Sequence, residues 1–127
     1  MVPLDATHRA LVTQEQCAAI GALGTPAARA TETFVTRRIN SYEAMQKMDI
    51  PNSAPVHDAL CVAALVEPDI LTIKRCHVAV ETAGALTLGR TVVDTHQRSR
   101  QEPNADVALD ADAARFVGML MEIFAKR

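Results

Sequence analysis

The longest apolar run in the sequence covers Ala59 to Val66, which are eight consecutive apolar residues. A run this rich in alanine and leucine, closed by Glu67-Pro68, favours a buried helix over a strand. Pro55 stands just before the run, where a missing N–H costs nothing, and Pro68 stops the helix. The pattern predicts a buried helix with Asp58 in or next to its first turn, near the positive end of the helix dipole.

The N-terminal part of the chain alternates between polar helix-start signals and apolar residues. Met1 to Asp5 reads as the end of a strand. Thr13-Gln14-Glu15-Gln16 is a capping-box pattern, which predicts a short helix ended by Gly21 and Gly24. Thr25-Pro26 then combines an N-cap residue with a proline at the first helical position, so a second helix is predicted to begin there.

This second helix is predicted to run to about Ile39. One face of this helix is marked by residues at helical spacing, which are Ala27, Ala30, Phe34, Val35 and Arg38. Residues 40 to 53 show no clear period and are predicted to form a loop before the central helix, with Tyr42, Met45 and Met48 as its bulky members.

After Pro68, apolar and polar residues alternate loosely, and several residues are β-branched. Ala83-Gly84 reads as a turn within this part, and residues 96 to 103 are polar and read as a loop. Strands are predicted over Ile73–Glu81, Leu86–Asp94 and Ala105–Leu109.

A closing helix is predicted to begin near Asp110 to Asp112. Its apolar residues fall at helical spacing, and they are Ala113, Phe116, Val117, Leu120, Ile123 and Phe124. Met119 and Met121 are interpreted as core packing.

This order of elements predicts an α/β layered fold in which helices accompany an incomplete mixed sheet with a hairpin. The chain has 127 residues, of which 49% are hydrophobic, and this is enough for one domain with its own core. We therefore expect residues 1–127 to form a single domain.

Charge and cysteine content narrow the classes of function. The net charge of −2 gives no reason to expect a nucleic acid or a membrane surface as partner. The three cysteines, Cys17, Cys61 and Cys76, are odd in number and lack metal-site spacing, so we do not expect a disulfide framework. Reduced thiols are typical of the cytoplasm, so we expect a cytoplasmic location. The sequence shows no cleavable leader, and its longest apolar run is too short to cross a bilayer.

His57 and Asp58 form an unusual polar pair against the apolar run, and two interpretations compete. In one, Asp58 caps the helix and His57 lies in the entering loop. In the other, Asp58 gives an oxygen ligand to a cation and His57 exchanges a proton with a substrate. The two residues by themselves do not decide between these interpretations.

The surrounding sequence resembles a known family. Ala54 to Ala63 is similar to the Pro-Leu-His-Asp-Pro-Leu-Ala-Val-Ala segment of the inosine-uridine preferring nucleoside hydrolases, and Val2 to His8 is similar to their Val-Pro-Leu-Asp-Val-Thr-His stretch. Val80–Thr82, Leu86–Asp94 and Asn104–Leu109 follow in the family's order. The resemblance covers nearly the whole chain and matches the C-terminal part of such enzymes.

The resemblance implies hydrolysis of the N-glycosidic bond of a ribonucleoside, with a calcium ion that binds ribose hydroxyls and the attacking water. By position, Asp58 matches the family's C-terminal calcium ligand. His57 matches the histidine that helps to protonate the departing base. Tyr42, Met45 and Gln46 lie roughly where the family places residues that close over the base.

The remaining polar candidates are given a structural or solvated role. His8 lies in a matched stretch without an assignable function, so we interpret it as a structural histidine. His77 and His96 have no partner at metal-ligand spacing. Arg37-Arg38 is interpreted as a solvated helix face.

One departure from the family changes the functional expectation. The family's Asp-x-Asp-x-x-x-Asp-Asp cluster, which supplies most calcium ligands and the general base, is absent from this sequence. One aspartate does not make a calcium site, because affinity rises with the number and charge of the ligands. We therefore expect a C-terminal portion of a nucleoside hydrolase that is inactive alone and binds a ribonucleoside only with an N-terminal portion.

The alternative is a truncated, inactive remnant that acts as a structural or oligomerisation module. In either case the strand at Met1–Asp5 and the helix Ala59–Val66 would lack neighbours. Unpaired strand edges and exposed apolar faces promote association, so we expect a homo-oligomer or docking onto an N-terminal partner.

Overall fold

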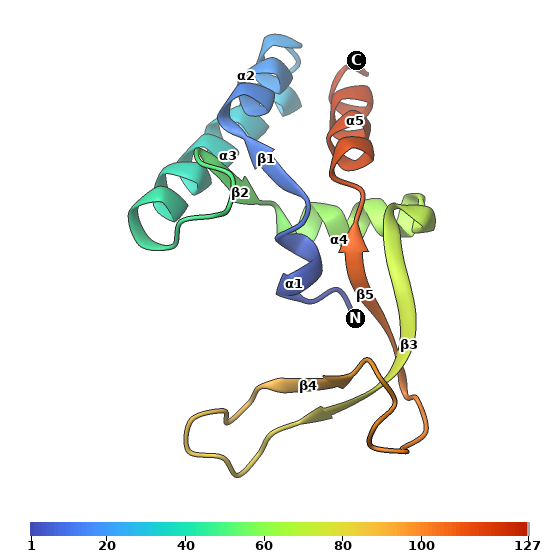
Figure 1. Cartoon of the computed structure of the whole chain (residues 1–127). Coiled ribbons are helices and arrows are strands. Elements are labelled where there is room, and N and C mark those ends of the chain that lie inside the picture. The colour runs from blue at the N-terminus through green and yellow to red at the C-terminus, as the bar shows by residue number, and fades with distance from the viewer. Residues whose placement is uncertain (127) are drawn as a thin grey trace.

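A computed structural model describes residues 1–126, which fold into helices and strands (Figure 1). The elements are α1 (Leu4–Thr7), β1 (Leu11–Thr13), α2 (Gln14–Ala22), α3 (Pro26–Met45), β2 (Ser53–Pro55), α4 (His57–Val66), the 3-10 turn η1 (Pro68–Ile70), β3 (Leu71–Val80), β4 (Thr91–Asp94), β5 (Ala105–Ala111) and α5 (Ala113–Phe124). The α/β class predicted from the sequence is confirmed.

The strands divide into two small antiparallel sheets. β1 pairs with β2, with Val12 opposite Ala54, and the other sheet has the order β4-β3-β5. The hairpin of β3 and β4 was predicted, but its second strand covers only Thr91–Asp94, because residues 85–89 lie in turns. Glu81 holds this connection, since its carboxylate accepts hydrogen bonds from the backbone of Ala83 and Gly84.

The prediction that Met1 to Asp5 ends a strand is wrong. Leu4–Thr7 forms the helix α1, and Met1 has no strand assignment. Met1 nevertheless lies beside β5: its ammonium group donates to the carbonyl oxygen of Asp106, and its carbonyl accepts from the N–H of Ala108 at 2.9 Å. The first residue therefore covers part of the outer edge of β5.

The helix starts predicted in the N-terminal half are confirmed. Thr13 and Gln16 form a reciprocal capping box at α2, and Thr25 caps α3 ahead of Pro26. Gly24 between them adopts a φ of 77°, a conformation that glycine enters at little cost and that turns the chain sharply from one helix into the next.

The prediction that α3 ends near Ile39 is wrong. Of its predicted face Val35 is buried, whereas Ala27, Ala30 and Arg38 are exposed. The helix continues to Met45, so residues 40–45 are helical instead of forming a loop. Its buried residues are Ala28, Val35 and Ile39, whereas Phe34 is 69% exposed. The buried face is set by packing against α2, β2 and the core, and polar residues between the apolar ones obscured it in the sequence.

α4 occupies the predicted position but is buried on one side only. Leu60 and Ala63 are buried, whereas Leu65 is 84% and Val66 70% exposed. The expectation that this helix is fully buried is therefore wrong. The C-terminal half of α4 presents an apolar surface.

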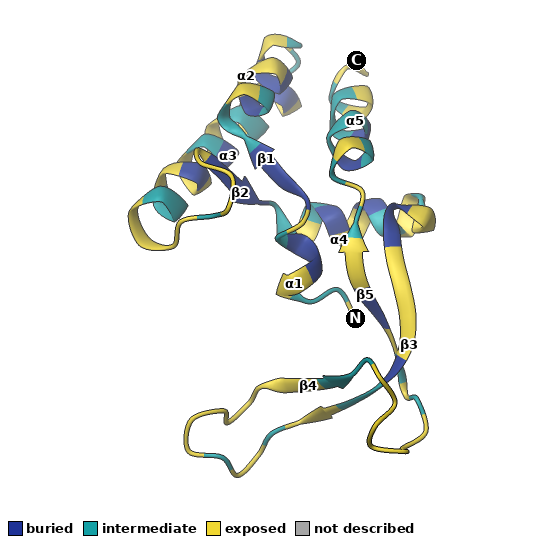
Figure 2. Ribbon diagram, viewed as in Figure 1, coloured by how far each residue is buried: buried dark blue, intermediate teal, exposed yellow. Residues whose placement is uncertain are grey.

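The core joins residues from both halves of the chain. α5 is capped by Asp112 and contributes Phe116 and Met119, while Met121 is half-buried. These side chains belong to one apolar cluster with Val12, Cys17, Ile39, Leu60 and Ile70, among others. The buried residues gather where the helices meet, whereas the arm formed by β4 and the outer half of β3 extends away and is mostly exposed (Figure 2).

Candidate functional site

The first turn of α4 sets His57 and Asp58 beside two other elements. β2 leads directly into α4 and pairs with β1, which follows α1, so the start of α4 lies close to α1. Val56 is the N-cap and offers no side-chain hydrogen bond. The interpretation that Asp58 caps the helix is therefore wrong, and His57 is the first helical residue, not a member of the entering loop.

Both ring nitrogens of His57 have a partner. Nδ1 lies 2.8 Å from the hydroxyl oxygen of Thr7 in α1, and Nε2 lies 3.2 Å from the hydroxyl oxygen of Tyr42 in α3. Three separate helices thus meet at one imidazole. Thr7 is buried and Tyr42 is half-buried, so these contacts fix the orientation of the ring.

Arg38 completes the group from one turn earlier in α3. Its Nη2 donates to the hydroxyl of Tyr42 at 3.3 Å, and its guanidinium carbon lies 4.7 Å from the centroid of the same ring. This cation–π geometry orients the tyrosine and places a positive charge near His57. Arg37 and Arg38 are both exposed, as expected for a solvated helix face, and Arg38 contacts Tyr42 in addition.

The pKa of His57 is lowered from its ordinary value. Burial is the largest cause, because it penalises the charged imidazolium, and the neighbouring His8 and Arg38 act in the same direction. The rings of His8 and His57 have centroids 5.8 Å apart. Asp58 opposes the shift but does not cancel it. His57 therefore holds its proton less tightly than a free histidine.

Two cavities adjoin this group and share Arg38 as a lining residue. One of ≈ 320 Å³ is lined by Arg38, His57 and Asp58 together with apolar residues of α3 and β2. The other, of ≈ 130 Å³, is lined by Arg38, Tyr42, Met45 and Gln46 among others. Tyr42, Met45 and Gln46, which the sequence singled out, thus lie together on the last turns of α3, with Tyr42 in contact with His57.

Asp58 differs from His57 in being exposed, and the described residues give its carboxylate no hydrogen bond. Within residues 1–126, no three side chains of His, Cys, Asp or Glu come together in a way that would hold a metal ion.

The other histidines lie away from this cluster. His77 is in β3 and His96 follows β4, so both belong to the exposed arm. Sequence reasoning missed Thr7, and it assigned Arg38 to a solvated helix face without linking it to His57. Thr7 stands in the matched stretch Val2–His8, directly before the histidine that drew attention, so its position was available as a signal.

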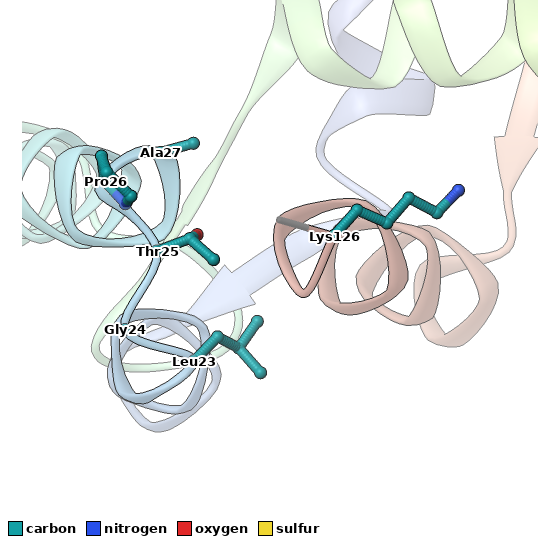
Figure 3. A pocket seen from close by; sticks show the side chains of 6 residues that line it. All are labelled: Leu23, Gly24, Thr25, Pro26, Ala27 and Lys126. Carbon is teal, nitrogen blue, oxygen red and sulfur yellow. The ribbon is translucent and has the colours of Figure 1, made fainter.

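A larger cavity than these two, ≈ 640 Å³, lies elsewhere, between the α2–α3 turn and the end of α5 (Figure 3). Leu23, Thr25 and Lys126 line it. The Thr25 hydroxyl donates to the carbonyl of Phe124 at 2.8 Å and so ties α3 to α5. This cavity holds no group of titratable side chains, and His57 stays the centre of the candidate site.

The fold is that of nucleoside hydrolases. A purine-preferring ribonucleoside hydrolase from Gardnerella vaginalis superposes with a TM-score of 0.80 at 26% identity, over 98% of this chain and 39% of that one. A plant nucleoside hydrolase gives a TM-score of 0.81 at 17% identity, which shows likeness of fold alone.

The sequence matches the profile of the inosine-uridine preferring nucleoside hydrolases over residues 1–118, and the chain belongs to this family. The non-specific ribonucleoside hydrolase RihC of Salmonella schwarzengrund is 37% identical over 98% of this chain. The pyrimidine-specific ribonucleoside hydrolase RihA of Salmonella newport is 35% identical over 96%. The chain spans 38% and 39% of the lengths of these two relatives.

None of the helices within residues 1–126 has the length and apolar character needed to span a bilayer.

Proposed function

We propose that this chain supplies the leaving-group side of a ribonucleoside hydrolase active site. The observation that carries the proposal is the position of His57. It lines one cavity, and its Nε2 is held by Tyr42, which lines a second cavity; Arg38 is a lining residue of both. Family membership supports a ribonucleoside as the substrate. Met45 and Gln46 are proposed to lie against the base.

Hydrolysis of a nucleoside breaks the bond between ribose C1′ and a base nitrogen. The electron pair leaves with the nucleobase, which must take up a proton. The attacking water adds its oxygen to C1′ and gives a proton to a general base. Protonated His57 is suited to the first proton transfer, because histidine gains and loses its proton near neutral pH. Its lowered pKa makes it a stronger acid that is charged in a smaller fraction of molecules at neutral pH.

The resemblance also implies calcium, which takes 6–8 oxygen ligands. We propose Asp58 as this chain's single contribution to such a site, because its carboxylate is exposed next to the cavity that His57 lines. One carboxylate is too few for a calcium site, so the described residues support no tight binding by themselves. The role proposed for His57 rests on Tyr42 and the cavities alone.

It follows that the isolated chain should release no ribose from inosine or uridine, since the carboxylate cluster of the family is absent from it. The direct test is a chimera in which this chain replaces the matched 38% of the Salmonella RihC relative. A chimera that hydrolyses nucleosides, and loses this activity in its His57→Ala form, supports the proposal. An isolated chain that hydrolyses inosine at an enzyme-like rate overturns the proposed dependence on further residues.

A second candidate function is that of an oligomerisation module. The apolar surface of α4, formed by Val62, Leu65 and Val66, favours it, because exposed apolar side chains gathered on one helix mark association surfaces. We propose a second copy of this chain as the occupant. A monodisperse monomer in light scattering over a wide concentration range would contradict this candidate.

We also propose a reducing compartment such as the cytoplasm. Cys17, Cys61 and Cys76 are all free thiols, and free thiols persist where disulfides are kept reduced.

A further inference from the structure

The hydrogen bonds around His57 form a continuous series, and the donor and acceptor roles at its two ends are fixed. At one end the guanidinium of Arg38, which can only donate, contacts the hydroxyl of Tyr42 at 3.3 Å. At the other end the hydroxyl of Thr7 donates to the carbonyl of Leu4 at 3.3 Å, and a carbonyl can only accept. His57 lies between the two hydroxyls, with contacts of 3.2 Å and 2.8 Å.

Counting the available hydrogens fixes which partner donates in each of these hydrogen bonds. Tyr42, neutral His57 and Thr7 each carry one hydrogen that can be donated along this series. If Thr7 donates to Leu4, its oxygen must accept from His57, so Nδ1 carries the hydrogen. Nε2 is then an acceptor and receives the hydroxyl hydrogen of Tyr42, whose oxygen accepts from Arg38. All four contacts are then hydrogen bonds.

The opposite tautomer makes fewer bonds. With the hydrogen on Nε2, the imidazole donates to Tyr42, and Thr7 must turn its hydroxyl to Nδ1 and give up Leu4. The Leu4 carbonyl then keeps only its bond from the N–H of His8 at 2.8 Å, and the oxygen of Thr7, a residue that is only 2% exposed, is left without a donor. One net hydrogen bond corresponds to roughly a two- to tenfold preference.

We infer that Thr7 is a positioning residue that holds neutral His57 in the Nδ1–H tautomer through its own bond to the Leu4 carbonyl. The ring nitrogen that carries the hydrogen is set by the partner of the other nitrogen, and here that partner is a buried hydroxyl whose hydrogen is already committed. In this tautomer Nε2 is the unprotonated nitrogen, and it faces Tyr42, which lines the same cavity as Arg38. The tautomer follows from these contacts and does not depend on the proposed function.

The test is nitrogen NMR of the intact chain labelled with ¹⁵N-histidine, recorded at about pH 8.5, well above the ordinary histidine pKa of about 6.5. The His57→Gln variant assigns the His57 signals among those of the four histidines. We expect Nδ1 of His57 at a protonated, pyrrole-like shift and Nε2 at an unprotonated, pyridine-like shift. A wild-type spectrum with these two assignments reversed overturns the inference.

Variants separate the role of Thr7 from that of a merely structural residue. Thr7→Val keeps the shape and removes the acceptor, so the Nδ1–H preference should fall by roughly two- to tenfold. Thr7→Ser should restore it. Tyr42→Phe should keep the Nδ1–H form, because Thr7 still accepts.

Thr33→Val is the matched control, since the Thr33 hydroxyl also donates to a backbone carbonyl, that of Arg29, but on an exposed part of α3. It should leave the His57 shifts unchanged. An unchanged tautomer in folded Thr7→Val would overturn the inference. If Thr7→Val fails to fold, the wild-type assignment and Thr7→Ser still decide it, and neither depends on nucleoside hydrolysis.

Discussion

Glu67, the residue after the last turn of α4, forms a two-point ion pair with Arg115 of α5. Arg115 Nε lies 2.8 Å from one carboxylate oxygen, and Nη2 lies 2.6 Å from the other. The hydrogen bonds from Arg115 lower the pKa of Glu67 below its ordinary value. The two residues are 48 positions apart in sequence, and their ion pair joins the end of α4 to α5.

This ion pair predicts an acid-dependent part of the stability. A carboxylate whose pKa is lower in the folded state stabilises the fold fully above its unfolded pKa, and the contribution is lost as pH falls through the folded pKa. Glu67→Gln should therefore lower stability more at about pH 7 than at about pH 3, which urea unfolding at both values would measure. Glu102→Gln is the control, because the side chain of Glu102 is exposed and forms no ion pair among residues 1–126. An equal loss at both pH values would contradict the prediction.

Phe116→Ala should destabilise the chain strongly. Phe116 is 0% exposed and belongs to the core cluster that joins both halves of the chain. Truncating a buried phenylalanine costs about 3–5 kcal/mol, because apolar burial is lost and a cavity remains. Phe34→Ala is the matched control: Phe34 is 69% exposed, and a change there should stay within about 0.5 kcal/mol. Thermal or urea unfolding of both variants checks this, and similar losses would show that the core is placed wrongly.

Thr25→Ala should destabilise the junction between α3 and α5. Its hydroxyl caps α3 by accepting from Ala28 and also donates to the carbonyl of Phe124. Loss of such a cap costs about 0.5–2 kcal/mol. Thr33→Ala removes a hydroxyl from the exposed middle of the same helix and should cost less. Urea midpoints of the two variants that fall in the reverse order would contradict this account.

Leu65→Asp should weaken self-association while leaving the fold intact. Leu65 is 84% exposed on the apolar surface of α4, so a charge there costs little in the monomer but much in an apolar interface. Leu86→Asp is the control on the β3–β4 arm, where Leu86 is 99% exposed. Light scattering that shows association lost only with Leu86→Asp would assign the contact to the arm instead.

His57→Ala in the chimera with the Salmonella relative should slow nucleosides whose base needs a proton by about 10²–10⁴-fold. Ribosides with good leaving groups should be affected much less, because they depart without protonation. Rates on inosine and on an activated aryl riboside would be compared, with Thr33→Ala as control. Equal losses on both substrates would show that His57 is not the acid.

Several elements followed from neighbouring residues alone. The capping box Thr13–Gln16, the start of α3 at Thr25-Pro26 and the apolar spacing of α5 were all predicted correctly. In each case the decisive hydrogen bond or periodicity lies within a few residues of sequence, so the interaction is encoded where it acts. Family membership, and with it the interest in His57 and Asp58, came from the same local motifs.

Tertiary structure alone decided the rest. The end of α3 at Met45, the one-sided burial of α4 and the short strand β4 depend on which neighbours each segment meets. The site shows the limit most clearly: Thr7 and His57 are 50 residues apart in sequence and 2.8 Å apart in space. No local pattern encodes that distance, because it results from the pairing of β1 with β2 and the packing of α1 and α3 around the start of α4. The sequence thus singled out His57 and Asp58 as candidates, and only the packed chain determined which hydrogen bonds hold His57.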